Sequence, residues 1–202
     1  MVFRVALGNM GYFFRQPGAF MRALRDGPDV IGALAVADTL AFLLAVGAAT
    51  SGRIVPEASW AFLGRFLVLY LLVFIVQCLF ICFEAGCATL AGLLLGRSPA
   101  MLPMVSAMGY ARVPLVAGAL VYIFLPGACC LSALAPGAFG PTELGEAFAR
   151  RIEVFELLTL GLQYMAMHLT GGLGKLESIG VLIIGWVAGT AIFHQVLISL
   201  LG

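Results

Sequence analysis

Residues 66–83 read FLVLYLLVFIVQCLFICF, a run without any charged residue and with a single amide, Gln77. Such a run is typical of a helix with lipid as its solvent, because about 20 apolar residues at about 1.5 Å each cross a hydrocarbon core of roughly 30 Å. Nothing breaks the helical pattern at Glu84, and the sequence GRSP at residues 96–99 predicts its end. We therefore predict a membrane-spanning helix over residues 66–95 that is longer than the bilayer core, with Glu84 at the depth where lipid gives way to water or protein.

The composition of the whole chain agrees with this helix. The 202 residues are 62% hydrophobic and 10% charged, with a mean hydropathy of +1.09. These values are too apolar for a soluble domain, and the length allows several spans but no sizeable extramembrane domain. A net charge of +1 creates no field that would attract nucleic acid. The predicted fold class is all-α, a polytopic membrane protein whose first partner is the lipid bilayer.

Apolar runs separated by glycine, proline and charged residues predict five membrane-spanning helices. A short N-terminal segment, residues 1–29, precedes this membrane domain of residues 30–202. Within the third span, Pro114 suits a first helical turn, whereas Pro126-Gly127 predicts a kink or an unwound turn. The predicted spans are residues 30–49, 66–95, 113–135, 154–169 and 179–201.

The N-terminal segment contains a short amphipathic pattern that begins at Pro17, a favourable first helical residue. Phe20, Met21 and Leu24 share one face, and arginines occupy the opposite face. This pattern predicts a short helix lying in the membrane interface, with its aromatic side chains at the acyl boundary. The alternative is a connector whose phenylalanines pack on the helix bundle.

The distribution of basic residues predicts the topology in the cell (inner or plasma) membrane. A cytoplasmic N-terminus leaves seven Lys and Arg residues inside and four outside, which the positive-inside rule favours. With five spans, the C-terminus then lies outside. The seven inner residues are Arg4, Arg15, Arg22, Arg25, Arg97, Arg112 and Lys175.

Polar residues within the predicted spans form a candidate intramembrane site. Asp38 lies about 12 Å deep, and Gln77 falls within a turn of the same level, so that we expect the two to meet. Gln163 and His168 bracket this level on the fourth span. A mid-membrane carboxylate is a functional candidate by default, although the alternative is that Asp38 acts only as interhelical glue. His194, next to Gln195, is interpreted as a packing residue near the membrane edge.

No pattern predicts a catalytic or metal site. The cysteines at 78, 82 and 87 lie on one predicted helix, but Cys87 is rotated away from the face shared by the other two. Sequences typical of nucleotide binding, nucleophilic hydrolysis or zinc proteolysis are absent. The predictions are no enzymatic activity, no catalytic residue, no metal and no cofactor.

Two small-residue patterns predict close helix contacts. Ala88 and Gly92 form one such face near the end of the second span, and Gly185 and Gly189 form a GxxxG pattern in the fifth. Both patterns fit either an oligomer contact or packing within the bundle.

Several of these features together resemble a known family. They are Pro17 followed by Phe20, Pro28 before the first span, a long second span ending in small residues and Gly96-Arg97, and GYAxxP over residues 109–114. In this combination the chain resembles the Yip-domain family of Ypt/Rab-interacting membrane proteins in its shorter prokaryotic form. The resemblance implies a five-span bundle with a cytoplasmic N-terminus.

Two functional hypotheses follow from the sequence. The first is a non-catalytic membrane organiser or assembly subunit that forms homo-oligomers or binds other membrane subunits. The second is a small transporter or lipid-handling protein with a site around Asp38, motivated by the buried carboxylate and the predicted break at Pro126-Gly127.

Overall fold

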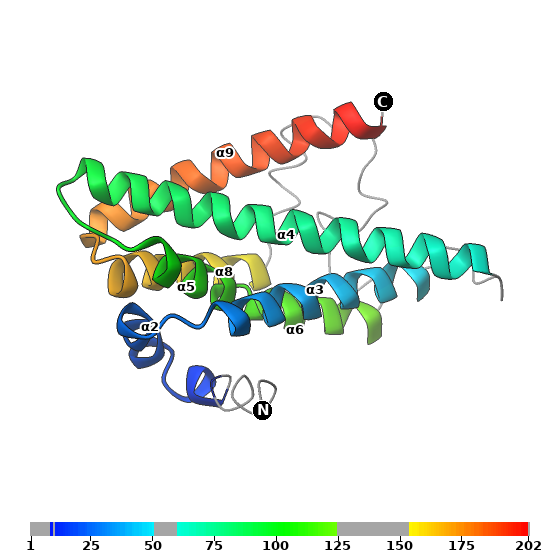
Figure 1. The fold of residues 1–202 in the computed structure, drawn as a ribbon, viewed down its shortest axis with the longest axis horizontal. Helices are drawn as coiled ribbons and strands as arrows, with labels where there is room; N and C mark the ends of the chain where they lie inside the picture. Colours follow the sequence, from blue (N-terminus) through cyan, green and yellow to red (C-terminus); the bar gives the residue numbers. More distant parts are fainter. Residues whose placement is uncertain (1–8, 10, 51–59, 125–153, 202) are drawn as a thin grey trace.

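The structure, a computed structural model, describes residues 9, 11–50, 60–124 and 154–201, and all regular structure in these ranges is helical. Figure 1 shows the helices lying roughly along one common axis, with α2 across one end of the bundle. η2 is a π-helix that continues directly from α8. The elements in chain order are α2 (Pro17–Asp26), α3 (Val30–Thr50), α4 (Trp60–Leu94), α5 (Met101–Ala111), α6 (Val113–Phe124), α8 (Val154–Met165), η2 (Ala166–Thr170) and α9 (Lys175–Leu201).

Four segments of the described chain are long and apolar enough to cross a membrane: Val30–Gly47, Phe62–Leu94, Met101–Val121 and Lys175–Ile192. The all-helical fold class predicted from the sequence is thus confirmed for the described residues. The predicted fourth span corresponds to α8 and η2. The predicted break at Pro126-Gly127 lies outside the described residues.

α4 is the longest element, with 35 residues and a length of about 52 Å. It begins at Trp60, six residues before the predicted start, and ends at Leu94, within one residue of the predicted end. The end is a Schellman motif, in which Gly96 has a φ of +72° and the Arg97 N–H donates to the Gly92 carbonyl at 2.8 Å. Glycine adopts this left-handed conformation without steric cost.

The predicted start of the third span at Val113 is wrong. The sequence between the predicted spans suggested a short link over residues 104–112, but residues 101–111 form α5, most of which is buried. α5 and α6 are separated only at Arg112 and together provide the third candidate span. Pro103 lies in the first turn of α5, where no N–H is needed, whereas Pro114 cannot donate to the carbonyl of Tyr110 and so interrupts the helical ladder.

α2 packs its apolar face on the bundle. Phe20, Met21 and Leu24 are buried, and the Thr170 hydroxyl donates to the Met21 carbonyl at 2.6 Å. This arrangement agrees with the alternative in which the phenylalanines contact the bundle, so these side chains are not available to lipid. The opposite face of α2 exposes Arg22 and Arg25.

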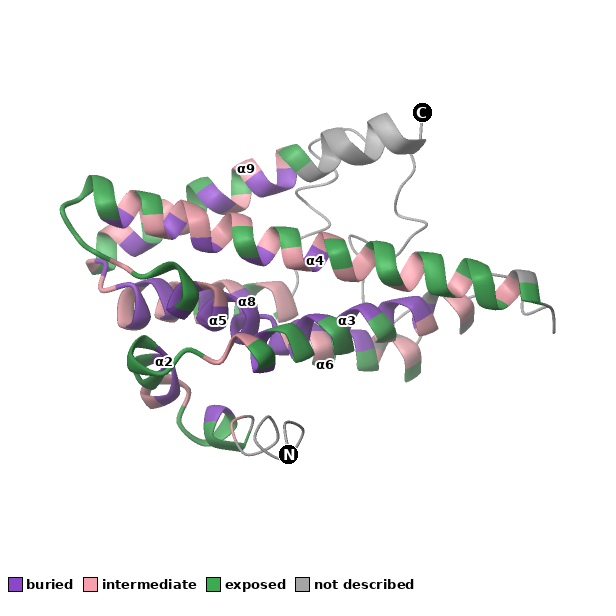
Figure 2. Ribbon diagram, viewed as in Figure 1, coloured by how far each residue is buried: buried purple, intermediate pink, exposed green. Residues whose placement is uncertain are grey.

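The core lies where α5 meets α2, α3 and η2, and Figure 2 shows buried residues concentrated on these elements. α3 and α5 cross at very short range, because a Cβ added at Gly109 would lie 2.9 Å from the Cα of Ala33. A Cβ at Gly32 would lie 2.8 Å from the Tyr110 ring carbon that carries the hydroxyl. These two glycines let α3 approach α5.

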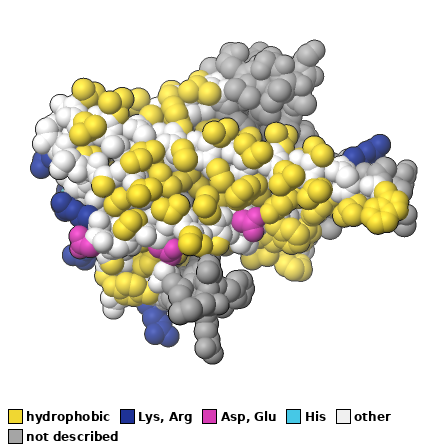
Figure 3. Space-filling view, viewed as in Figure 1, with side chains coloured by type: hydrophobic (Ala, Val, Ile, Leu, Met, Phe, Trp, Pro, Cys, Tyr) yellow, Lys and Arg dark blue, Asp and Glu magenta, His cyan; other side chains and the backbone are white. Residues whose placement is uncertain are grey.

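Most large side chains on the outside of α4 and α9 are apolar. Figure 3 shows hydrophobic side chains across most of one face of the molecule, with Lys and Arg gathered toward its margins. The exposed apolar residues of these two helices include Leu67, Val68, Leu71, Leu72, Ile75 and Leu79 on α4, and Ile179, Ile183, Ile184 and Val187 on α9.

Candidate functional site

A buried ion pair joins α4 to the break between α5 and α6. Arg112 Nη2 lies 2.9 Å from Glu84 Oε2, and the two side chains are only 7% and 13% exposed. A buried charge needs both an opposite charge and hydrogen bonds, since its desolvation costs several kcal/mol in a protein interior. The pair therefore depends on the groups around it.

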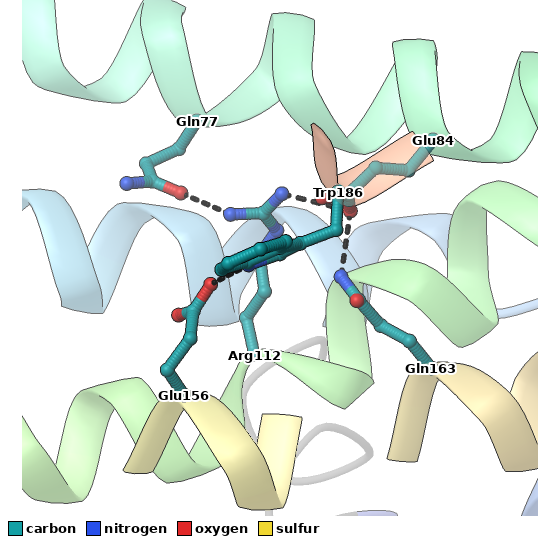
Figure 4. A network of polar contacts seen from close by, with 6 residues as sticks. All are labelled: Gln77, Glu84, Arg112, Glu156, Gln163 and Trp186. Carbon is teal, nitrogen blue, oxygen red and sulfur yellow. Dashed lines mark hydrogen bonds and ion pairs between the residues drawn. The ribbon is translucent and has the colours of Figure 1, made fainter. Parts of the chain in front are cut away.

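Two glutamines complete the hydrogen bonds of this pair (Figure 4). Arg112 Nη1 donates to Gln77 Oε1 at 2.7 Å, and Gln163 Nε2 donates to Glu84 Oε2 at 2.8 Å. Gln77 and Glu84 are seven residues apart on α4, which places them on one face about two turns apart. We call these four residues, Gln77, Glu84, Arg112 and Gln163, the ion-pair cluster.

One N–H donor of the Arg112 guanidinium has no hydrogen-bond acceptor. Arg112 Nε is buried and makes no hydrogen bond, while Cζ of the same side chain lies 5.8 Å from the centre of the Phe80 ring. The ring face offers the cation a weak electrostatic partner on this side. The guanidinium is thus held by a carboxylate, an amide and an aromatic ring, all from α4.

A second polar contact lies beside the cluster in Figure 4. Trp186 Nε1, on α9, donates to Glu156 Oε1, on α8, at 3.3 Å. Since α9 also packs on α4, these contacts connect α8 and α9 with the helix that carries Glu84.

The cluster is suited to holding helices together. Its residues come from α4, α8 and the junction of α5 with α6, so one cation and one anion fix three segments of the bundle. The hydrogen bonds of Arg112 and Glu84 in the described part of the chain involve amides and each other, and include no hydroxyl, thiol or imidazole.

The expected contact between Asp38 and Gln77 is wrong. Gln77 is 3% exposed and bonds Arg112, whereas Asp38 is exposed on α3 and accepts a hydrogen bond from the Tyr70 hydroxyl. The Gln77 carbonyl oxygen accepts from the Arg112 cation, and such a charge-assisted hydrogen bond is stronger than one between neutral groups. The depth estimate was insufficient because it leaves open which side of the helix a residue faces.

Asp38 is an exposed carboxylate within a candidate span, and the Tyr70 hydroxyl donates a hydrogen bond to it. A carboxylate at the centre of a membrane helix costs about 2.5–3.5 kcal/mol, and an interhelical hydrogen bond returns about 0.6–1.7 kcal/mol. The Tyr70 hydroxyl therefore offsets only part of this cost.

His168 lies in the last turns of the α8–η2 segment. Its Nδ1 is 2.7 Å from the Leu173 carbonyl, and its ring stacks on Tyr164 at 6.0 Å between centroids. Both contacts are local, so His168 belongs to the end of η2 and not to the ion-pair cluster. The side chains of His194 and Gln195 lie outside the described residues.

The four predicted packing residues have different surroundings. Ala88 is buried in the core, and Gly92 faces the Pro99 ring in the turn after α4. A Cβ at Gly189 would lie 3.3 Å from the Phe80 ring of α4, whereas one at Gly185 would meet nothing within 4 Å. Of the GxxxG pair, Gly189 thus contributes to the contact between α9 and α4.

The structure also describes three of the cysteines. Cys78, Cys82 and Cys87 are free thiols, and the described residues contain no group of three or more His, Cys, Asp and Glu side chains that could hold a metal ion.

The roles of Arg112 and Glu84 were not predicted from the sequence, although a signal was present. Glu84 lies ten residues before the end of α4 and Arg112 eleven residues after the start of α5, about 15 Å and 16 Å from the shared link. Opposite charges at matched depths on consecutive apolar helices indicate an ion pair.

A second missed site lies at the start of α3. Asp29 accepts hydrogen bonds from the Gly32 N–H at 2.8 Å and from the Tyr110 hydroxyl and Asn9 Nδ2 at 2.6 Å each. Burial raises the pKa of Asp29, but the hydrogen bonds from Tyr110, Gly32 and Asn9 together outweigh it and the net pKa is lowered. An Asp just before an apolar helix is a typical N-cap signal.

Comparison of the chain with family models, curated proteins and solved structures finds no match.

Proposed function

We propose that this chain is a non-catalytic integral membrane protein of the Yip-like type that acts as a membrane organiser or assembly subunit. The observation that carries the proposal is the ion-pair cluster, in which Arg112, Glu84 and both glutamines bond one another. Polar groups that bond one another across three segments favour one packing arrangement of a bundle, and in the described part of the chain the side chains of this cluster bond one another. The apolar outer faces of α4 and α9 support contact with lipid or with other membrane helices.

The proposal includes five spans. α8 and η2 add seventeen residues, or about 25 Å, which approaches the thickness of a bilayer core. The alternating directions of α3, α4, α5–α6, α8 and α9 in Figure 1 support a further crossing between α6 and α9. An odd number of crossings gives the two termini opposite sides of the membrane.

The proposal also includes a cytoplasmic N-terminus. The residues Arg22, Arg25, Arg97 and Lys175 are exposed on α2, on the link after α4 and at the start of α9. The link and α9 are joined by an ion pair of 4.0 Å between Arg97 and Glu177. Arg112 lies between two helices and is no longer counted as a loop residue. The remaining basic residues at the end of the bundle that carries α2 still favour a cytoplasmic position for that end.

A second candidate function is a small transporter or lipid-handling protein with a site around Asp38. The exposure of this carboxylate within a candidate span favours it, because intramembrane acidic residues are typical of transport paths. Loss of transport or lipid transfer by reconstituted Asp38→Asn protein, with unchanged thermal stability, would support this function.

The assembly proposal is tested by counting subunits in the native membrane. Full-length tagged protein is extracted directly into polymer nanodiscs, and its mass is measured by native mass spectrometry and by stepwise photobleaching. We expect more than one copy of the chain, or a constant second protein, in most discs. Discs that contain one copy and no other protein would contradict the proposal.

A further inference from the structure

We propose that the exposed face of α3 around Asp38 binds a membrane-spanning helix of a partner protein that carries a Lys or Arg side chain at mid-membrane depth. This inference rests on the proposed function as an assembly subunit, and it identifies the chemistry of the partner. We define the α3 face by its exposed residues, which are Ile31, Leu34, Ala35, Asp38, Thr39 and Phe42.

These residues form a continuous stripe. They recur at intervals of three and four positions, so they lie on one side of the helix over about three turns. Asp38 is near the middle of α3, about 12 Å from Val30 and about 18 Å from Thr50. A lipid headgroup at the membrane surface is too far away to neutralise a carboxylate at this depth.

The carboxylate has unused acceptor capacity. Tyr70 donates to Oδ1, and Oδ2 accepts no hydrogen bond from the described residues. The ion pairs of the described chain are Arg97 with Glu177 and Arg112 with Glu84, so neither includes Asp38. The neighbouring hydroxyl of Thr39 donates to the Ala35 carbonyl in its own helix and does not serve Asp38.

A basic helix fits this face better than other occupants do. Acyl chains have no donor for Oδ2, and a two-fold contact between copies of this chain would bring the two Asp38 carboxylates together. A cation supplies both charge and donors, as Arg112 does for Glu84 inside the bundle. The small side chains of Ala35 and Thr39 beside Asp38 allow a second backbone to approach closely.

The experiment uses full-length protein in lipid vesicles with synthetic helices as probes. One probe is a leucine-alanine helix of about 20 residues with a single central Lys, and the other has Leu at that position. Energy transfer between labelled protein and labelled probe measures their association. We expect the Lys probe to bind about tenfold more tightly than the Leu probe. Asp38→Asn should remove this preference.

Two controls separate charge from folding. Tyr70→Phe keeps the carboxylate and should retain the preference for the Lys probe, and thermal unfolding of each variant in detergent checks that the bundle is intact. Equal binding of the two probes, or a preference that persists in Asp38→Asn, would overturn the inference. Efficient cross-linking between two copies through Phe42→Cys would also overturn it, because a second copy would then cover the face.

Subunit counting distinguishes this inference from the proposed function. If native assemblies persist in Asp38→Asn nanodiscs, the protein is an assembly subunit whose partner binds elsewhere, and the inference fails alone. If the wild-type protein is a single copy without a partner, the proposed function itself fails.

Discussion

Arg112 carries the one buried cation in the described part of the chain, and its value to the fold depends on Glu84. Removing one member of a buried pair leaves the other charge without compensation, which costs about 3–5 kcal/mol. Replacing both members with apolar residues removes the desolvation penalty together with the attraction. Replacing one member of the pair should therefore lower the stability of the fold, whereas replacing both should restore most of it.

We predict that Arg112→Leu and Glu84→Leu each lower the free energy of unfolding by about 3–5 kcal/mol, and that the double variant regains most of this loss. Denaturant unfolding in detergent, arranged as a double-mutant cycle, measures the coupling. Arg97→Gln is the matched control, because its pair with Glu177 is long and exposed and should contribute about 0–1 kcal/mol. Additive losses in the double variant would contradict a coupled pair.

The site at Asp29 predicts a dependence on pH. Because the pKa of Asp29 is lowered in the folded protein, its stabilisation is fully present above the ordinary aspartate pKa of about 4 and is lost as the pH falls through the folded value. Limited proteolysis of the N-terminal segment with an acid-active protease should therefore accelerate as the pH falls below about 4.

The Asp29→Asn variant provides the control for this acid effect. It should be cleaved faster than wild type at about pH 5, where the wild-type Asp29 carboxylate is still ionised, and should lack the additional acceleration that comes from protonating Asp29. A wild-type profile that matches the variant at every pH would show that Asp29 does not hold this end of the bundle.

The partners of the polar residues in the predicted spans could not be predicted from the sequence. Counting along the spans put Asp38 and Gln77 at similar levels, yet the two face different sides of the bundle. Rotation about each helix axis is decided by packing, and here the cation on Arg112 attracts both Gln77 and Glu84. Arg112 itself was counted among the basic residues on the inner side, just before the predicted third span.

At the scale of single elements, prolines explain the main error. Pro103 suggested a link, whereas it lies in the first turn of α5, a mostly buried helix, where a missing N–H has no cost. The same pattern therefore fits a loop and a broken helix. The long α4 was predicted well because no proline interrupts it and its end is marked by glycine.

The crossing of α3 and α5 provides a test of packing. Gly109→Ala adds a methyl group that overlaps Ala33, so the two helices must separate, and we expect a loss of about 1–3 kcal/mol in the free energy of unfolding. Gly86→Ala in α4 is the control, since a Cβ there meets nothing within 4 Å and should stabilise the helix by up to about 1 kcal/mol. Equal effects of both substitutions would contradict the close crossing.

At the scale of the whole molecule, a simple experiment tests the proposed topology. With the proposed five spans and a cytoplasmic N-terminus, a reporter that needs the cytoplasm should be active at the N-terminus and inactive at the C-terminus. Alkaline phosphatase, which needs an oxidising compartment, should give the reverse pattern. Cytoplasmic reporter activity at both ends would indicate an even number of crossings.

The solvent of the whole molecule was the easiest property to predict, because 62% hydrophobic composition leaves little polar surface. The arrangement of the helices was not predictable, since lipid-facing and protein-facing residues are both apolar and give no amphipathic signal in α3 and α4. Only the few polar residues in the spans indicate which side of a helix faces its neighbours, and they do so once their hydrogen-bond partners are known.

The ion pair between Glu84 and Arg112 also has a consequence for biogenesis. The two residues are 28 positions apart on consecutive helices joined by the short link at residues 95–100. Each helix alone would carry an uncompensated charge into the lipid, whereas the pair enters nearly neutral. We therefore expect the translocon to release α4 and α5–α6 together as one hairpin, and a ribosome stalled before Arg112 to leave α4 incompletely inserted.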